Sequence, residues 1–240
     1  MLTVQKFGGS SVADADKIRR AAKIVAAAHM RGDDVVVVLS AQGDTTDELL
    51  EKAAELTATP NARELDVLLT TGEQVTVALM AMCLEEQGFP VVSLTGWQAG
   101  VKTTDVHGDA RIVCIETDRL RRHLQRGQIV IVAGFQGLDS EGDLTTLGRG
   151  GSDTTAVALA GALGADRCQI FTDVDGVYTK DPRKYPDAEK LWEVTYDRML
   201  TMAREGAQVL HDRCVELAKE YGIVIEVLSS HEDVPGTLVR

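Results

Sequence analysis

The chain has 240 residues, a mass of 25.9 kDa and a formal net charge of −12 at pH 7. Such an acidic chain lacks the basic surface with which proteins bind nucleic acids or anionic membranes, so neither is expected as a partner. Its 44% hydrophobic and 26% charged residues exclude a disordered chain and predict a globular protein with a sizeable core.

Short runs rich in β-branched residues alternate with segments of helical spacing along the whole chain. Strands are expected at 2–7, 35–40, 90–95, 128–133, 169–172 and 223–228, and helices at about 14–30, 46–57, 73–87, 110–126, 154–163 and 207–220. Two short strands near 100–103 and 143–146 are expected to form a flanking hairpin, and 59–63 a loop. Runs such as VVVVL and IVIVA are apolar on both faces, which is typical of a mainly parallel sheet between helices. The sequence therefore predicts one three-layer α/β domain.

Compartment signals in the sequence indicate the cytoplasm. The four cysteines lie far apart without a C-x-x-C pair, as in a reduced protein rather than a disulfide scaffold or a zinc ribbon. The chain does not open with a basic region followed by a long apolar stretch, so no signal peptide is expected. The longest purely apolar run, 35–39, is far short of a membrane span.

The first predicted strand ends in a glycine-rich corner, KFGGSS, that contains Lys6, Gly8, Gly9 and Ser10. Two glycines allow a tight turn with successive N–H groups exposed, the following helix adds partial positive charge, and Lys6 adds a full charge. This combination suits a polyphosphate, although a tight turn beside a surface lysine explains the motif equally well. The absence of G-x-x-x-x-G-K-[ST] and G-x-G-x-x-G argues against a P-loop protein and a nicotinamide-dependent dehydrogenase.

A second glycine-rich corner, GRGGSDTT at 148–155, leads into another predicted helix. Its glycines leave the guanidinium of Arg149 accessible among backbone donors, which suits a carboxylate or a phosphate. Asp153 is expected to orient a lysine or a metal-bound phosphate. Ser152 and Thr154 are expected to cap the helix.

Three further polar clusters stand out, two of them after predicted strands and one, TTGE, before a predicted helix. One cluster is TDVDGVYTKDPR at 172–183. It offers carboxylates for ribose hydroxyls, an aromatic surface and two cations for phosphate. The alternative is that it forms only an Asp-Gly turn followed by a solvated loop. SAQGDTT at 40–46 and TTGE at 70–73 place hydroxyl groups and a carboxylate at the strand ends where open α/β sheets bind ligands. The expected position of Glu73 at a helix start is also favoured by the helix dipole alone.

Taken in order, the motifs VQKFGGSSV, SAQGDTTDELL, LLTTGEQV, IVAGFQG, TTLGRGGSDTT and TDVDGVYTKDPR resemble those of aspartate kinases, and the resemblance covers residues 2–240. It implies the amino-acid kinase fold, a three-layer αβα sandwich with an eight-stranded, mainly parallel sheet. It also implies one catalytic domain over 1–240, with the amino acid bound by its N-terminal part and the nucleotide from about residue 150 onward. The implied reaction converts MgATP and L-aspartate to ADP and 4-phospho-L-aspartate, the first step of the aspartate-family amino-acid pathway.

The resemblance also implies roles for individual residues. Lys6 would neutralise the transferring phosphoryl group, and Asp153 would organise that lysine. The expected ATP-binding residues are Lys6, Gly8, Gly9, Ser10, Thr172, Asp173, Tyr178, Lys180 and Arg183. The expected aspartate-binding residues are Ser40, Thr46, Glu73, Arg149, Gly150, Gly151 and Ser152. No metal-binding residue is expected, because Mg²⁺ would be bound mainly through ATP.

The chemistry of aspartate fits these residue types. Its ammonium and two carboxylates need an acid and a cation, which Glu73 and Arg149 supply. The attacking carboxylate, with a reference pKa of about 3.9, is already ionised at pH 7, so no general base is required. Catalysis then depends on positioning and charge stabilisation, which lysine, glycine N–H groups and Mg²⁺ provide.

Two features depart from the aspartate kinase pattern. Gln208 stands where the family usually has a lysine that approaches the nucleotide, which predicts weaker ATP binding, and Asp212 replaces a proline. The sequence stops at Arg240, before the paired regulatory ACT domains of typical aspartate kinases. This predicts no feedback inhibition of the isolated chain by lysine or threonine. It leaves open a naturally unregulated protein, control by a separate regulatory subunit, or a truncated sequence.

Other interpretations stay open at this point. A homodimer is expected from family likeness alone. Another kinase of the same superfamily, acting on glutamate, acetylglutamate or a related acid, would use the same residue types. A nucleotide-binding or regulatory subunit without turnover is the non-enzymatic alternative.

Overall fold

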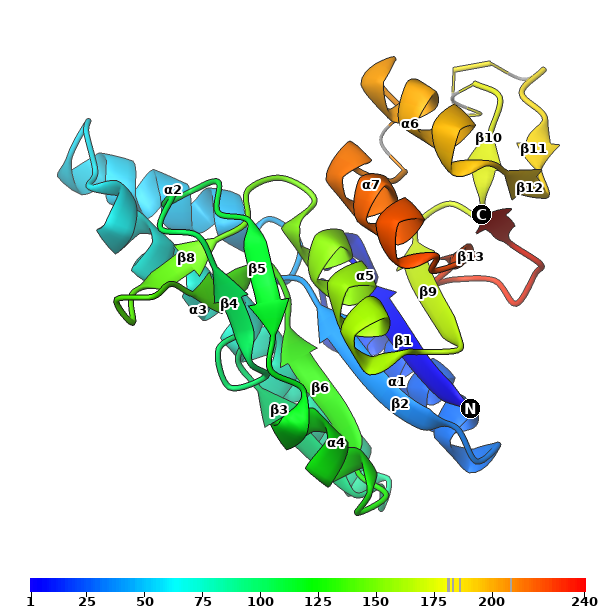
Figure 1. Cartoon of the computed structure of the whole chain (residues 1–240), viewed down its shortest axis with the longest axis horizontal. Coiled ribbons are helices and arrows are strands. Elements are labelled where there is room, and N and C mark those ends of the chain that lie inside the picture. The colour runs from blue at the N-terminus through cyan, green and yellow to red at the C-terminus, as the bar shows by residue number, and fades with distance from the viewer. Residues whose placement is uncertain (181, 183, 186, 208) are drawn as a thin grey trace.

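A twisted eight-stranded sheet runs through the molecule and carries helices on both faces (Figure 1). The computed structural model describes residues 1–180, 182, 184–185, 187–207 and 209–240. In spatial order the strands are β12 (Glu193–Val194), β14 (Thr237–Val239), β13 (Ile225–Ser229), β9 (Arg167–Thr172), β1 (Leu2–Phe7), β2 (Asp34–Leu39), β6 (Ile129–Ala133) and β3 (Val91–Leu94). Every neighbouring pair is parallel except β13 and β14. The predicted eight-stranded, mainly parallel sandwich is confirmed.

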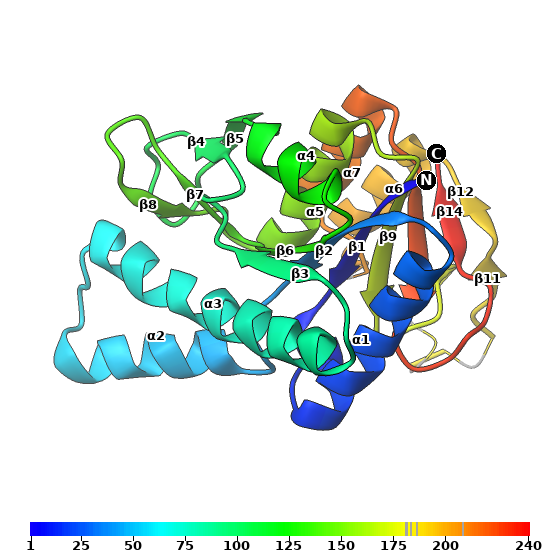
Figure 2. The same ribbon diagram turned by 90° about the horizontal axis from the view of Figure 1, so that it is seen from below.

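The helices form two layers with the sheet between them (Figure 2). One layer holds α1 (Ala15–Met30) and α3 (Ala62–Glu86), and the other holds α4 (Asp118–Leu124), α5 (Gly151–Leu163), α6 (Tyr196–Arg204) and α7 (Asp212–Tyr221). An apolar core lies on each face of the sheet. Strand β2 contributes side chains to both cores, because successive side chains of a strand point to opposite faces. Val35, Val37 and Leu39 pack in the core that includes α1 and α3, whereas Val36 and Val38 pack in the core that includes α5. The continuous VVVVL run is therefore explained by burial on both faces.

Helix α3 begins eleven residues earlier than predicted, at Ala62 instead of residue 73. The side chain of Asn61 accepts a hydrogen bond from the Arg63 N–H and caps the helix start. The expectation that Glu73 opens a helix is wrong, because TTGE lies in the middle of α3. Gly72 lets α3 pack closely against Ala41, since a Cβ at this position would lie 2.8 Å from the Cβ of Ala41.

The expected flanking hairpin is also wrong in its pairing. A separate four-stranded sheet has the order β5 (Ile112–Ile115), β4 (Val101–Thr103), β7 (Gln136–Leu138) and β8 (Leu144–Thr146). The two expected strands are β4 and β8, but β7 lies between them and pairs with both. The segment predicted as one helix at 110–126 instead forms β5 and the short helix α4, because β5 completes this small sheet as its edge strand.

Helices α2 (Thr45–Leu56) and α6 and a two-stranded ribbon lie outside the two sheets. Helix α2 packs against α3, and β10 (Val177–Tyr178) pairs with β11 (Lys190–Leu191) in the ribbon. Helix α6, which was not predicted from the sequence, packs against α7. It carries only Met199 and Leu200 as buried residues, so its apolar pattern is short.

One described helix, α3, is long and apolar enough to cross a membrane by length and composition, with a window of mean hydropathy 1.6. Within that window 44% of the residues are buried inside the fold. Core helices of globular proteins meet the same criterion, and α3 packs against α1, α2, β3 and β6.

The order of the strands determines where a ligand can bind. The central strand β1 has β2 on one side and β9 on the other. From β1 the chain continues to β2 on one side, and from β9 it continues to β12 and β13 on the other, so the two connections run in opposite directions along the sheet. Open α/β sheets bind ligands at such a switch point, beyond the carboxyl ends of the strands. The glycine corner after β1, the SAQGDTT segment after β2 and the TDVDGVYTKDPR segment after β9 all begin at this edge.

Candidate active site

Lys6 and Asp153 form an ion pair at the carboxyl end of β1. The Lys6 Nζ lies 2.6 Å from Asp153 Oδ1, and the side chains are only 11% and 13% exposed. Lys6 is the penultimate residue of β1, and Asp153 lies in the first turn of α5. A Cβ on Gly8 would lie 3.3 Å from this amine, so the glycine keeps the space beside Nζ open. The pair joins the two glycine-rich corners that the sequence singled out.

A cavity of about 720 Å³ surrounds this ion pair. It brings together most of the predicted catalytic, phosphate-binding and aspartate-binding residues: Lys6, Gly8, Gly9, Ser40, Thr46, Glu73, Arg149, Gly150, Gly151, Ser152 and Asp153. Ser10 does not line it; this residue is exposed in the short 3₁₀ turn Gly9–Ser11. Strand β1, the segment after β2, helix α3 and the start of α5 therefore converge on one space.

Glu73 is a deeply buried acid of the cavity, at 3% exposure. Its Oε1 accepts a hydrogen bond of 3.1 Å from the Ala41 N–H, whereas Oε2 has no hydrogen-bond partner among the described residues. Burial raises the pKa of Glu73 to about 7. A buried acceptor without a partner is costly, so this oxygen is suited to receive a donor from a bound molecule.

Arg149 and the start of α5 form another part of the cavity lining. Gly148 and Gly150, on either side of Arg149, have φ of 73° and 69°, in the left-handed region that favours glycine. No side chain caps α5; Thr154 Oγ1 donates to the Gly150 carbonyl instead, and Ser152 lines the cavity. The prediction that Ser152 and Thr154 cap this helix is therefore wrong. The uncapped helix start and the guanidinium together can bind an anion.

Gly150 is expected to be intolerant of a side chain for two reasons. An alanine there adopts a left-handed φ, and its Cβ would overlap the His211 side chain. We expect Gly150→Ala to lower the free energy of unfolding by about 2–4 kcal/mol and kcat/KM by about tenfold or more, as measured by urea unfolding and steady-state assay. Gly164→Ala is the matched control, because Gly164 has φ of 68° and no atom within 4 Å of the added Cβ. Equal losses in both variants would mean that the collision with His211 has no effect.

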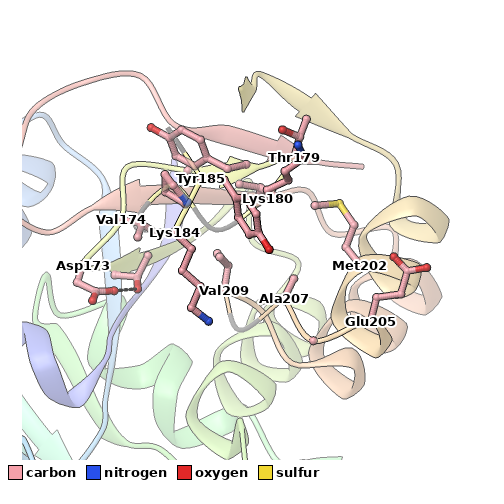
Figure 3. A pocket seen from close by; sticks show the side chains of 16 residues that line it. Asp173, Val174, Thr179, Lys180, Lys184, Tyr185, Met202, Glu205, Ala207 and Val209 are labelled. Atoms are coloured by element: carbon pink, nitrogen blue, oxygen red, sulfur yellow. Dashed lines mark hydrogen bonds between the residues drawn. The ribbon is translucent and has the colours of Figure 1, made fainter. Parts of the chain in front are cut away.

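A second cavity, of about 500 Å³, follows β9 and β10. Four of the residues expected to bind ATP, Thr172, Asp173, Tyr178 and Lys180, line it, whereas Arg183 and Gln208 lie outside the described residues. Figure 3 shows Asp173 and Val174 at one end of this cavity and Met202 and Glu205 at the other. The Tyr178 hydroxyl donates to Asp175 Oδ1 at 2.7 Å, and this bond raises the pKa of the Tyr178 phenol.

The two cavities lie at the ends of neighbouring strands, since β1 and β9 end side by side. Phe7 pairs with Phe171, their rings stack with centroids 4.6 Å apart, and the Gly8 N–H donates to the Phe171 carbonyl at 3.5 Å. The residue after Phe171 is Thr172, which lines the second cavity. Thr172 of the second cavity thus ends the strand that pairs with β1, and β1 itself ends between Lys6 and Gly8 of the first.

Several residues of the first cavity were missed by the sequence analysis. Phe135 is the one described residue other than glycine with a positive φ, 70°, and a Cβ on Gly151 would lie 2.8 Å from its ring. Such backbone strain is typical of functional sites but leaves no trace in the sequence. Asp66 and Thr146 also line the cavity. Asp66 had a usable signal, because it lies two helical turns before Glu73 on the same face of α3.

Among the described residues, one group of side chains could hold a metal ion. His107, Asp139 and Asp143 offer ligand atoms within 4.8 Å of one another. Arg63 already pairs with Asp143 at 2.5 Å and lowers the pKa of that carboxyl. Because the guanidinium occupies Asp143, this group does not by itself constitute a metal site.

The comparisons with known proteins agree with this geometry. The model of the amino acid kinase family matches residues 1–229. An aspartokinase from Bacillus sp. (strain MGA3) is 56% identical over 239 residues, which cover 100% of this chain and 58% of that relative. The aspartate kinase structure from Synechocystis has a TM-score of 0.89 and 48% identity, covering 100% of this chain and 40% of its own.

A second solved structure is that of E. coli aspartokinase III in complex with aspartate and ADP. Its TM-score is 0.86 at 31% identity, and the match covers 100% of this chain and 64% of that one. This chain thus spans less than two thirds of the length of the relatives that it matches. The family model covers nearly the whole sequence, and the chain belongs to the amino acid kinase family.

Proposed function

We propose that the chain transfers the γ-phosphoryl group of ATP to the side-chain carboxylate of L-aspartate, giving ADP and 4-phospho-L-aspartate. Relatives named aspartokinase, similar over the whole chain, support this assignment. The observation that carries it is the Lys6–Asp153 ion pair, which lies in the same cavity as a buried acid, Glu73, and a guanidinium, Arg149.

Aspartate is complementary to the first cavity. Its ammonium would donate to Glu73 Oε2, the acceptor that lacks a partner among the described residues. Arg149 would bind one carboxylate bidentately, with Ser40 and Thr46 available for further hydrogen bonds. The other carboxylate would then point towards Lys6. This carboxylate is already ionised at neutral pH. Lys6 therefore needs only to hold it close to the phosphoryl group, which is also negatively charged.

ATP would lie across both cavities. The adenosine end would lie in the second cavity, beside Tyr178 and Asp173, and the phosphates would extend to Gly8 and Gly9. A Cβ on Gly9 would lie 2.7 Å from the Ala41 carbonyl, so only glycine allows this close turn. Lys6 would stabilise the charge that develops on the transferred group, with Asp153 fixing its amine. Mg²⁺, bound through the phosphates, would offset further negative charge.

The remaining expectations belong to the same proposal. Residues up to about 150 would mainly bind the amino acid and later residues the nucleotide, within one domain over 1–240. We further propose a cytoplasmic enzyme of lysine, threonine and methionine biosynthesis that forms a homodimer.

A hydroxylamine trap tests the proposed reaction. Hydroxylamine converts an acyl phosphate to a hydroxamate, so the purified chain is incubated with MgATP, hydroxylamine and, separately, aspartate, glutamate and acetylglutamate. We expect hydroxamate and stoichiometric ADP with aspartate. Hydroxamate with glutamate or acetylglutamate alone would assign another amino acid kinase activity, and nucleotide binding without ADP formation with any acid would indicate a non-catalytic subunit.

Gln208→Lys is expected to strengthen ATP binding. The prediction rests on the sequence, because residue 208 lies outside the described residues. A lysine at this position would add a cation near the polyphosphate, so KM for ATP should fall by about threefold to tenfold without a change in KM for aspartate. Gln87→Lys, at the exposed end of α3, adds the same charge away from both cavities. An unchanged KM for ATP in Gln208→Lys would refute the idea.

A further inference from the structure

Asp66 is a buried residue, and both oxygens of its carboxylate are hydrogen-bonded to groups of one loop and one strand. The residue is 1% exposed and lies on α3, seven positions before Glu73. Its Oδ1 accepts from the Thr146 hydroxyl at 2.6 Å, and its Oδ2 lies 3.0 Å from His107 Nδ1. The Gly108 N–H lies 3.1 and 3.0 Å from the two oxygens. Asp66 thus joins helix α3 to the 106–109 loop and to the end of β8.

These contacts continue from the 106–109 loop to Arg149. A Cβ on Gly148 would lie 2.9 Å from Asp109 Oδ1 and 3.2 Å from the Gly108 carbonyl, so the loop packs directly against the residue before Arg149. The Ala110 N–H donates to the Thr146 carbonyl at 2.9 Å. Any displacement of the loop would therefore move the backbone that carries Arg149.

A second tie holds the same loop from the other side. Arg213, on α7, donates to the Leu147 carbonyl at 3.1 Å and pairs with Asp109 at 2.7 Å. This pair is partly exposed, whereas the Asp66 cluster is buried and is the link to α3. Glu73 lies on α3, and the residue before Arg149 packs against the 106–109 loop. Because Asp66 joins α3 to this loop, it sets the separation between the acid and the cation of the first cavity.

We propose that Asp66 and His107 are positioning residues that determine the affinity for the amino acid substrate by fixing Arg149 opposite Glu73. The inference rests on the proposed function, of which it deepens the substrate side. His107 holds the loop through its Nδ1–H, and the carboxylate of Asp66 holds this tautomer in place. Neither side chain needs to touch the substrate, because the oxygens of Asp66 are already occupied by Thr146, Gly108 and His107.

The test compares His107→Leu with His107→Asn. Asparagine places an N–H donor close to the position of Nδ1, whereas leucine fills a similar volume without a donor. We expect His107→Leu to raise KM for aspartate by about tenfold, with KM for ATP and kcat each changed by less than about threefold. We expect His107→Asn to return KM for aspartate to within about threefold of that of the unaltered chain.

His123→Leu is the matched control, because His123 also donates or accepts at Nδ1, at 2.8 Å from Gln128 Oε1, but lies on α4. We expect it to leave KM for aspartate unchanged. A purely structural role for His107 would lower the active fraction, and so kcat, without changing KM, and that result would overturn the proposal. Failure of His107→Asn to restore KM would overturn it as well.

The two proposals fail in different ways. Absence of aspartyl hydroxamate with the unaltered chain counts against the proposed function alone, and the variants are then compared on whichever acid the chain phosphorylates. Amide hydrogen exchange provides a readout that needs no turnover. We expect faster exchange in 104–111 and 144–149 in His107→Leu but not in His107→Asn; unchanged exchange in both segments would contradict the positioning role.

Discussion

Replacing Lys6 by methionine is expected to lower kcat about a thousandfold while the fold is retained. Methionine keeps most of the side-chain volume and removes the ammonium that would neutralise the transferred phosphoryl group. The loss should appear in kcat more than in KM for aspartate, because Glu73 and Arg149 would still hold the amino acid. Single-turnover release of ADP with saturating aspartate and MgATP measures the chemical step directly.

Two controls separate this loss of catalysis from a loss of structure. Lys6→Met leaves Asp153, 13% exposed, without its ion-pair partner, so circular dichroism and thermal unfolding must accompany the assay. Lys17→Met removes another paired lysine, 3.9 Å from Asp14 on α1, and should leave kcat unchanged. A folded Lys6→Met variant with undiminished kcat would show that this amine does not stabilise the reaction.

The second large effect concerns Glu73, whose replacement by glutamine should raise KM for aspartate by about a hundredfold. Glutamine keeps the size of the side chain and an oxygen to accept the Ala41 N–H, but it cannot pair with an ammonium. KM for ATP should change little, because the second cavity does not include this residue. Isothermal titration with aspartate and steady-state kinetics measure the effect; an unchanged KM for aspartate would remove Glu73 from the substrate site.

Glu73 also predicts how aspartate binding depends on pH. Since its pKa is raised to about 7, the carboxylate that would bind the ammonium is lost as pH falls below 7. KM for aspartate should therefore rise by close to tenfold for each pH unit below about 6.5 and level off above about 7.5. In Glu73→Gln this pH dependence should disappear. An identical pH profile in both proteins would assign the titration to another group.

The same shift predicts a stability difference with a defined sign. An acid whose pKa is raised on folding binds its proton more tightly in the folded state than in the unfolded state. Above about pH 7 Glu73 is ionised in the folded protein, and this buried charge therefore lowers the free energy of unfolding. This cost is relieved as pH falls from about 7 towards 4.5, the value for the unfolded chain. Glu73→Gln should thus be more stable than the unaltered chain at pH 8, by on the order of 3 kcal/mol, and about equal to it at pH 5. Urea unfolding at the two pH values measures the difference.

The sequence was sufficient for the features that depend on local pattern. Runs that are apolar on both faces predicted buried parallel strands, and β2 and β6 have this burial. The glycine corners predicted turns beside Lys6 and Arg149, because φ above zero and close backbone approach favour glycine. Ordering the strands is a different problem, since the pairing of β1 with β9 joins segments more than 160 residues apart.

The errors have tertiary causes. Gly72 suggested a helix boundary, but the chain continues as a helix because glycine permits contact with Ala41. The segment at 110–126 has apolar residues at helical spacing, yet β5 forms where β4 provides a partner edge. Phe135 was missed because its backbone strain arises only when distant segments meet, and Asp66 because the helix that carries it was expected to begin at residue 73.

Reductive trapping of the product tests the central claim most directly. Borohydride reduces an acyl phosphate to an alcohol, so phosphorylation of the aspartate side chain gives homoserine, whereas phosphorylation of the α-carboxylate gives 3-amino-4-hydroxybutanoate. Arg149 and Glu73 would hold the α-amino acid end and Lys6 would face the side chain, so we predict homoserine, in an amount that matches ADP and falls about a thousandfold in Lys6→Met. 3-Amino-4-hydroxybutanoate, or homoserine at an equal rate in Lys6→Met, would contradict the account.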